Sequence, residues 1–170
     1  IAAVSVAKAI RDATGLTATI KWPNDILVHG KKVCGILTEM KAEQDMVDFI
    51  ILGMGINVNT SLRHLPKGGS SLREELRNEG SDPHISRIEL VKRVLEELER
   101  DYFLLQSAGS RPIIEEWKHL SDMLGGRVRV SLQSRSFEGL AHDIDPDGAL
   151  VIRLDSGILQ KVSSGDVIML

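Results

Sequence analysis

The chain has 170 residues, of which 42% are hydrophobic and 26% are charged, and this is the composition of an ordinary globular protein. Its formal net charge of −3 excludes a global electrostatic attraction for nucleic acid or for an anionic membrane surface. Any anion that it binds must therefore be held by a local arrangement of charges.

The sequence also bounds the cellular setting. A single cysteine, Cys34, excludes an intramolecular disulfide framework, and the five histidines do not follow the spacing of a zinc site. No run approaches 18 apolar residues, and the first residues show neither the basic segment nor the cleavage site of a secretory signal. We therefore expect a cytoplasmic protein without a membrane span. Because the sequence enters a helical pattern directly at Ile1, we also expect a fragment of a longer chain.

The first 60 residues predict one helix followed by strands. Residues 2–13 are amphipathic, and Gly15 is placed to end a helix. The segments "LTATIKW" and "NDILVHGKKVCGILTEM" predict strands, with a hairpin turn at His29 and Gly30. Pro23 removes a donor from the ladder and favours an edge or a bend. The apolar run "MVDFIILGMGINVN" predicts a strand that is buried on both faces.

The middle of the chain predicts helices. After a loop over residues 60–69, the segment "SSLREELRN" predicts a short helix capped by Ser70 or Ser71. Residues 85–105 give the longest helical signal, and residues 112–120 predict another helix with Pro112 in its first turn. The apolar face of the longest helix is expected to consist of Ile88, Val91, Leu95, Leu98 and Tyr102.

The last 45 residues predict a small β unit. After Gly125 and Gly126, turn residues separate four alternating segments: "RVRVSLQ", "SFEGLAHDID", "GALVIRLD" and "ILQKVSSGDVIML". Short strands at this spacing are typical of a small all-β barrel.

Polar residues and glycines interrupt the apolar strands between Lys21 and Asn57. Asn24 and Asp25 open one strand, and a Lys-Lys pair opens the next. Gly53 and Gly55 point to the same side of their strand, and the flat patch that they leave can receive a planar ring. Asn57 offers a donor and an acceptor at the rim of this patch, which suits the edge of a purine.

These residue types supply the parts of a nucleotide-dependent acyl-activating site. Lys32, supported by Lys21, offers positive charge for a carboxylate or phosphate, and Asp25 offers a carboxylate for Mg²⁺. The spacing alone is not specific, because the third glycine of a dinucleotide-binding fingerprint and a Walker motif are both missing. Strand-end charges and turn residues remain the alternative reading. We interpret Lys31 as a solvated surface charge and Cys34 as a small buried hydrophobe.

Five motifs follow one another along the chain: "KWPNDI", "GKKVCGIL", "GMGINVN", "GLAHDIDPDGALVIR" and "SSGDVIML". With these motifs in this order, the chain resembles the biotin protein ligases (biotin–[acetyl-CoA-carboxylase] ligases). The resemblance covers essentially the whole chain. It implies an α+β fold, with a partial ligase catalytic domain on a mixed sheet over residues 1–122 and an SH3-like β-barrel over residues 123–170. The implied reaction has two steps: biotin and Mg·ATP give biotinyl-5′-AMP and pyrophosphate, and a lysine of the biotin carboxyl carrier protein of acetyl-CoA carboxylase then receives the biotinyl group.

The resemblance also assigns roles to individual residues. Lys32 is expected to be the catalytic charge, in contact with the biotin carboxylate and the α-phosphate, and Gly35 and Leu37 are expected to line the biotin pocket with it. The residues expected at ATP and the adenylate are Lys21, Asn24, Asp25, Gly53, Gly55, Ile56 and Asn57, with Asp25 also at the metal. No protein nucleophile is required, because the biotin carboxylate and then the lysine of the partner attack.

The family's glycine- and arginine-rich loop, of the GRGRxGR type, lies before the helix at which this sequence begins. So do the positions that contact the biotin ring and the DNA-binding winged helix of regulatory members. We therefore expect about half a site and little or no ligase activity from the chain alone, no contact with membrane or nucleic acid, and a homodimer as one allowed assembly. Two alternatives stay open: a lipoate–protein ligase, which shares the fold and an "ND…KK..G" element, and a non-catalytic module that docks a carrier protein.

Overall fold

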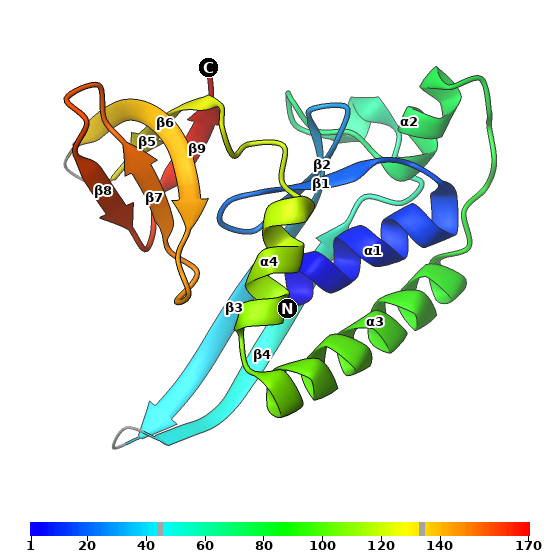
Figure 1. The fold of residues 1–170 in the computed structure, drawn as a ribbon. Coiled ribbons are helices and arrows are strands. Elements are labelled where there is room, and N and C mark those ends of the chain that lie inside the picture. Colours follow the sequence, from blue (N-terminus) through cyan, green and yellow to red (C-terminus); the bar gives the residue numbers. More distant parts are fainter. Residues whose placement is uncertain (44–45, 133–134) are drawn as a thin grey trace.

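The computed structural model describes residues 1–43, 46–132 and 135–170, which form two antiparallel sheets and four helices (Figure 1). The first sheet has the strand order β1-β2-β3-β4. Its strands are β1 (Ala18–Lys21), β2 (Asp25–Val28), β3 (Lys31–Glu43) and β4 (Met46–Ile56). The second sheet has the order β8-β7-β6-β5-β9. Its strands are β5 (Arg127–Ser131), β6 (Ser136–Ile144), β7 (Leu150–Arg153), β8 (Leu159–Val162) and β9 (Asp166–Met169).

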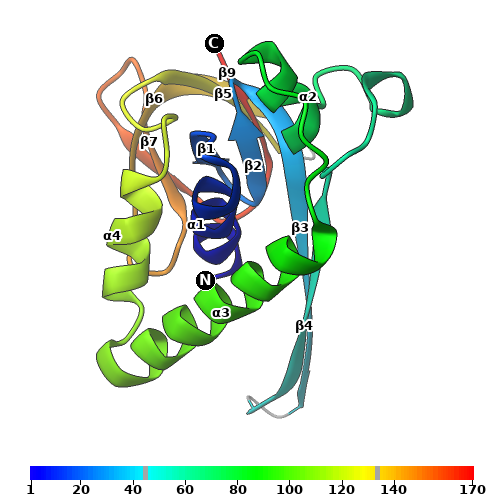
Figure 2. The same ribbon diagram turned by 90° about the vertical axis from the view of Figure 1, so that its right-hand side faces the viewer.

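The helices are α1 (Ala2–Thr14), α2 (Leu72–Asn78), α3 (Arg87–Ala108) and α4 (Arg111–His119), with a 3-10 turn at Leu62–His64. Figure 2 shows α1 in the middle of the molecule, with α3 and α4 around it and the first strands behind it. Small and β-branched residues of α1 are fully buried, including Val4, Ala7 and Ile10. They pack against one face of the first sheet, where Ile20, Ile26 and Cys34 are also buried, and this leaves the other face of that sheet available for a site.

A buried polar cluster joins α1 to α3. The carboxylate of Asp101 accepts a hydrogen bond from Ser5 Oγ at 2.9 Å and pairs with Lys8 Nζ at 3.1 Å. Ser5 and Asp101 are both buried, whereas Lys8 remains partly exposed and also pairs with Glu97 at 2.9 Å. Since a buried carboxylate is stable only when it is paired and hydrogen-bonded, this cluster fixes how the two helices pack.

We expect Asp101→Ala to lower the free energy of unfolding by about 2 to 3 kcal/mol, because it removes the shorter of the two hydrogen bonds of the buried Ser5 hydroxyl and one of the two carboxylate partners of Lys8. Urea denaturation followed by circular dichroism measures this change. The matched control is Glu99→Ala, an exposed carboxylate on the same helix, which we expect to change stability by less than about 0.5 kcal/mol. Equal effects of the two substitutions would contradict a structural role for the cluster.

Most of the predicted elements are confirmed. Gly15 ends α1 and Ser71 caps α2, where its hydroxyl accepts from the Glu74 amide at 3.3 Å. The turn between β2 and β3 lies at His29 and Gly30, both with positive φ (48° and 72°), a conformation that glycine adopts without strain. Pro23 lies in the bend between β1 and β2. The five strands of the second sheet lie within the four predicted segments, although Gln133, the last residue of the first segment, is outside the described residues.

The first sheet differs from the prediction in its strand directions and in its exposure. All named strands pair antiparallel, and the mixed sheet that was expected is reduced to one isolated parallel bridge between Lys32 and Gly69. The prediction that the apolar run of β4 is buried on both faces is wrong, because Phe49, Ile50 and Ile51 are each about half exposed. The reason is visible in Figure 1: β4 is the edge strand, and the outer half of the β3–β4 hairpin projects beyond β1 and β2.

The apolar face predicted for α3 is largely exposed and is not the face that the helix buries. Ile88, Val91, Leu95 and Tyr102 are exposed, and the helix instead buries Leu90, Val94 and Asp101. The buried side of α3 combines two apolar residues with Asp101, whose partners Ser5 and Lys8 belong to α1. None of the helices in the described part of the chain is long and apolar enough to cross a bilayer.

Candidate active site on the first sheet

A row of four predicted site residues crosses the first sheet. Lys21 lies opposite Asp25 in the β1–β2 ladder, Asp25 lies opposite Gly35 in the next ladder, and Gly35 lies opposite Gly55 in the third. Directly paired residues of antiparallel strands project from the same face, so the register brings all four to one side of the sheet. Lys21 Nζ lies 3.6 Å from one carboxylate oxygen of Asp25.

A bulge brings Lys32 to the same face. Ile26 pairs with Cys34 but the next residue, Leu27, pairs with Lys32, so Val33 is the extra residue in β3. In a regular strand Lys32 and Gly35 would point to opposite faces, and the bulge removes this alternation between them. Lys32 Nζ consequently lies 2.5 Å from Asp25 Oδ1, and its side chain crosses over Gly35. The bulge therefore places the predicted catalytic charge at the centre of the row.

We expect Gly35→Ala to displace the head of Lys32. A Cβ at this position would lie 3.2 Å from both Cε and Nζ of Lys32, closer than such atoms normally approach. A shift of this group by a few tenths of an ångström is expected to lower the rate of the reaction that it supports about tenfold. The measurement is kcat of the full-length gene product, with the melting temperature recorded in parallel. An unchanged kcat would show that the position of the Lys32 head is not critical.

The row ends at a cavity of about 490 Å³, which Gly35 and Gly55 line and Lys21 and Asp25 do not. Its floor contains Lys32, Gly35, Gly55 and Asn57, and its wall is the segment from His64 to Gly69. The cavity therefore brings together four of the residues predicted from the sequence. The wall residues His64 and Lys67 were missed, because the segment read as an ordinary Gly- and Pro-containing loop. A lysine beside two glycines was the only signal that could have drawn attention to it.

Backbone hydrogen bonds hold the wall against the floor. The Lys32 amide donates to Gly68 O at 3.0 Å, and the Ser70 amide donates to Lys32 O at 2.8 Å. These two bonds form the isolated bridge noted above. The position of Lys32 and the position of the loop are thus fixed together.

The other predicted site residues lie near the cavity without lining it. Leu37 and Gly53 oppose each other one step further along the hairpin, where Leu37 is 61% exposed. Asn24 donates its side-chain amide to the backbone oxygen of Ile36 and so fixes the turn before Asp25. Ile56 lies opposite Cys34 and packs against the core.

Lys31 lies at the surface, with 44% of its side chain exposed, but it is more than a solvated charge because its ammonium group has a buried partner. Its Nζ lies 3.0 Å from Oε1 of Glu75, a fully buried residue of α2. The interpretation of Cys34 is confirmed: the residue is fully buried, and burial raises the pKa of its thiol to about 12 despite the nearby positive charge of Lys32. Cys34 is therefore protonated and unreactive at neutral pH.

The C-terminal sheet contacts the motif residue next to the row. Trp22 is buried, and its indole Nε1 donates to Gly148 O, in the turn between β6 and β7, at 3.0 Å. A smaller cavity of about 230 Å³ lies at this junction, lined in part by Trp22, Asn24 and Trp117. The turn before the site is thus packed against the second sheet.

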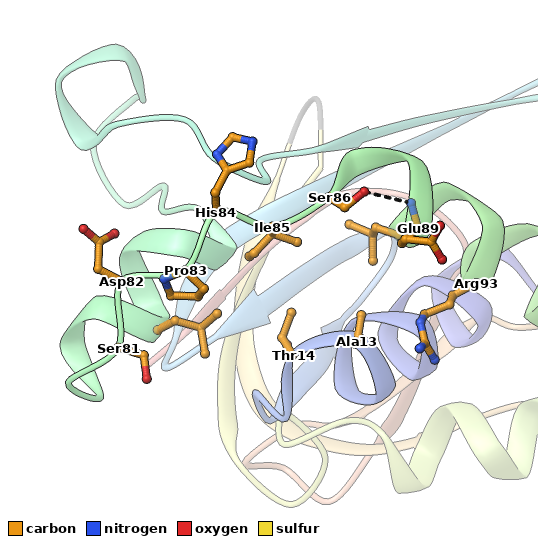
Figure 3. A pocket seen from close by; sticks show the side chains of 12 residues that line it. Ala13, Thr14, Ser81, Asp82, Pro83, His84, Ile85, Ser86, Glu89 and Arg93 are labelled. Carbon is orange, nitrogen blue, oxygen red and sulfur yellow. Dashed lines mark hydrogen bonds between the residues drawn. The ribbon is translucent and has the colours of Figure 1, made fainter.

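A larger cavity, of about 740 Å³, lies elsewhere, between the end of α1, residues 81–86 and the first turns of α3 (Figure 3). Two of its charged groups already have protein partners: Asp82 accepts from Arg73 and Arg77 at 2.9 and 2.7 Å, and Arg93 pairs with Asp12. Ser86 caps α3 by accepting from the Glu89 amide at 3.3 Å, the bond drawn in the figure. We assign no function to this cavity.

The site residues suit a metal ion that enters with the nucleotide better than one that the protein alone would hold. In the described part of the chain, no three His, Cys, Asp or Glu side chains converge as a metal ion would require. Asp25 is the carboxylate of the row, and it lies between two lysine ammonium groups. One carboxylate is compatible with Mg²⁺ only when phosphate oxygens and water supply the remaining ligands.

Two protein-family models match parts of this chain. The Biotin/lipoate A/B protein ligase family matches residues 1–57, which contain every strand of the row. The Biotin protein ligase C terminal domain matches residues 123–170, which contain the second sheet. The first match defines a class that handles biotin or lipoate, and the second narrows it. Both ends of the chain are thus similar to biotin protein ligases.

Individual relatives support this similarity. The chain is 36% identical over 167 residues to the "Bifunctional ligase/repressor BirA" of Bacillus subtilis (strain 168), covering 98% of this chain and 51% of that protein. It is 34% identical over 152 residues to the "Biotin--[acetyl-CoA-carboxylase] ligase" of Mycobacterium tuberculosis, covering 89% and 53%. The chain spans about half the length of these curated relatives. The crystal structure of the Aquifex aeolicus biotin protein ligase superimposes with a TM-score of 0.79 at 24% identity, over 99% of this chain and 72% of that one, and so has the same fold.

Proposed function

We propose that the full-length protein is a biotin–protein ligase. It activates biotin with ATP to biotinyl-5′-AMP and transfers the biotinyl group to a lysine of a biotin carboxyl carrier protein, that of acetyl-CoA carboxylase. The observation that carries this proposal is the Lys21–Asp25–Gly35–Gly55 row beneath Lys32 in a chain with this similarity. The names of the relatives from Bacillus and Mycobacterium support it.

The charges of the row suit an anionic substrate. Lys21 and Lys32 carry two positive charges against the single negative charge of Asp25, and Lys67 lines the same cavity as Lys32. Lys32 would leave Asp25 for the biotin carboxylate and the α-phosphate, and would stabilise the negative charge that develops as the anhydride bond forms and later breaks. The carboxylate of biotin attacks the α-phosphorus and pyrophosphate leaves; the amine of the carrier lysine then attacks the acyl carbon and AMP leaves.

The remaining residues would bind the substrates. Gly35 and Leu37 would line the biotin pocket, and the adenine and ribose would lie against the strand-end residues Gly53, Gly55, Ile56 and Asn57. Lys21 and Asn24 would act on the triphosphate, Lys21 through its charge and Asn24 through the turn that it fixes. Mg²⁺ would neutralise the triphosphate, with Asp25 as its protein ligand.

We further propose a boundary between a partial catalytic domain, residues 1–122, and a C-terminal domain, residues 123–170. In the described residues the second sheet does not close, since β8 and β9 are its two edge strands. Its five short antiparallel strands are compatible with an SH3-like barrel that is open between β8 and β9. We also propose that the full-length protein binds the biotin carboxyl carrier protein as its partner and that a homodimer is an allowed assembly.

A lipoate–protein ligase is the second candidate, because the family that matches residues 1–57 includes both activities. The match of residues 123–170 to a domain of biotin protein ligases favours biotin. The test is exchange of labelled pyrophosphate into ATP by the full-length gene product, with biotin or lipoate as the acid. We expect exchange with biotin alone. Exchange with lipoate alone would reassign the substrate, and exchange with neither acid would leave a carrier-docking module.

A further inference from the structure

Glu75 is a buried carboxylate for which the proposed reaction has no direct use. It lies in α2, its side chain is 1% exposed, and four side chains contact it. Ser70 Oγ donates to Oε1, and Lys31 Nζ lies 3.0 Å from the same oxygen. His29 Nδ1 lies 2.9 Å from Oε2, and Asn78 Nδ2 donates to that oxygen at 3.3 Å. A carboxylate is rarely buried, and it is stable there only when it is paired in this way. The position of Glu75 inside the protein therefore requires an explanation.

Three of the four partners of Glu75 come from the two segments that flank Lys32. His29 and Lys31 belong to the turn that leads into β3, immediately before Lys32. Ser70 directly follows the wall of the cavity, and its own amide donates to Lys32 O. The wall and the turn are otherwise joined at this point by the Lys32 amide bond to Gly68 O. One carboxylate therefore holds both sides of the strand segment that carries the proposed catalytic lysine.

We propose that Glu75 is a positioning residue, which locks the His29–Lys31 turn and the Gly68–Ser70 segment around Lys32 so that its ammonium group stays over Gly35 and beside Asp25. The expected effect of Glu75 on the reaction rate rests on the proposed function. Its expected effect on the position of the two segments does not. Lys31 then has a defined part: the first lysine of the pair ties the turn to α2, and the second faces the substrate.

The charge of Glu75 is consistent with this role. Burial by itself would raise its pKa, but hydrogen bonds from Ser70, His29 and Lys31 outweigh burial and hold the pKa below the ordinary value. Glu75 is therefore ionised at neutral pH. Because the folded-state pKa is lowered, the stabilisation is complete above the unfolded pKa of about 4.3 and is lost as the pH falls through the folded value.

The structural test is amide hydrogen exchange in the full-length gene product. In Glu75→Gln, which keeps the size of the side chain and removes its charge, we expect the amides of Lys32 and Ser70 to exchange at least about tenfold faster, while amides of the second sheet are unchanged. The matched control is Glu79→Gln, an exposed carboxylate that contacts His29 Nε2 at 3.3 Å and should leave both rates unchanged. If Glu75→Gln does not fold, Ser70→Ala removes one donor and should give a smaller change in the same direction. Unaltered exchange at both amides would overturn the proposal.

The kinetic test separates positioning from general stability. We expect Glu75→Gln to lower kcat for biotinyl-adenylate formation about tenfold with less than about a threefold change in KM for either substrate. In a Lys32→Ala background the same substitution should have no further effect, because the group that it positions is gone. A full additional loss in that background would show that Glu75 acts independently of Lys32 and would overturn the proposal. Absence of biotin-dependent turnover in the unmodified protein would instead refute the proposed function, and the amide exchange rates would still decide whether Glu75 holds the segment.

Discussion

Replacement of Lys32 by alanine in the full-length gene product is expected to lower the rate of biotinyl-adenylate formation at least about 100-fold, the scale of losing one preorganised charge contact. The bulge at Val33 and the absence of a side chain at Gly35 allow this ammonium group to lie beside Asp25, on the face of the sheet that forms the cavity floor. Biotin-dependent exchange of labelled pyrophosphate into ATP measures the rate.

The control for this prediction is Lys92→Ala, an exposed lysine of α3 away from the cavity. We expect it to retain the rate of the unmodified protein, because its charge faces solvent. A rate within about threefold of normal for Lys32→Ala, in a protein that folds, would remove Lys32 from its proposed role.

Loss of the Trp22 side chain is expected to have the largest effect on stability. Trp22→Ala should lower the free energy of unfolding by about 3 to 5 kcal/mol, since it removes a buried aromatic ring at the junction of the two sheets. Trp22→Phe retains most of the ring area but leaves Gly148 O without its donor, so we expect a loss of about 1 kcal/mol. Urea denaturation of the three proteins measures both differences.

The order of the two variants is the informative result. A loss that is equal for phenylalanine and alanine would mean that the indole N–H, and not the packing of the ring, stabilises the junction. A loss below about 0.5 kcal/mol for both would mean that the junction contributes nothing to stability.

The residues of the proposed site were selected from the sequence, but their arrangement was not. Residue types gave Lys32, Asp25 and the glycines, and turn chemistry gave the hairpin at His29 and Gly30. The row that joins Lys21 to Gly55 depends on strand register, and the position of Lys32 depends on a one-residue bulge. Neither feature leaves a signal in hydrophobic periodicity, because both are set by pairing with another strand.

Two further differences have the same origin in tertiary contacts. A continuous apolar run predicts a buried strand, but the exposure of β4 depends on its position at the edge of the sheet. Lys31 and Lys32 are adjacent and chemically identical, yet one pairs with the buried Glu75 of α2 and the other with Asp25. Glu75 lies 43 residues or more from both, in a segment for which the sequence predicted only a short capped helix.

The net charge of the chain conceals the local electrostatics of the site. A protein with a formal charge of −3 has no general affinity for a nucleotide. The cavity nevertheless gathers Lys32 and Lys67, with Lys21 reaching Asp25 from the next strand. Short-range contacts of this kind are screened less than long-range ones, so substrate binding is expected to persist at physiological ionic strength.

The location of the site can be tested directly by amide NMR spectra of the isotope-labelled full-length gene product during addition of biotin and Mg·ATP. The proposed site predicts the largest shifts at Lys32, Gly35, Gly55 and Asn57, the residues on the floor of the 490 Å³ cavity. Shifts confined to residues 81–93 around the 740 Å³ cavity, with the floor residues unchanged, would contradict it.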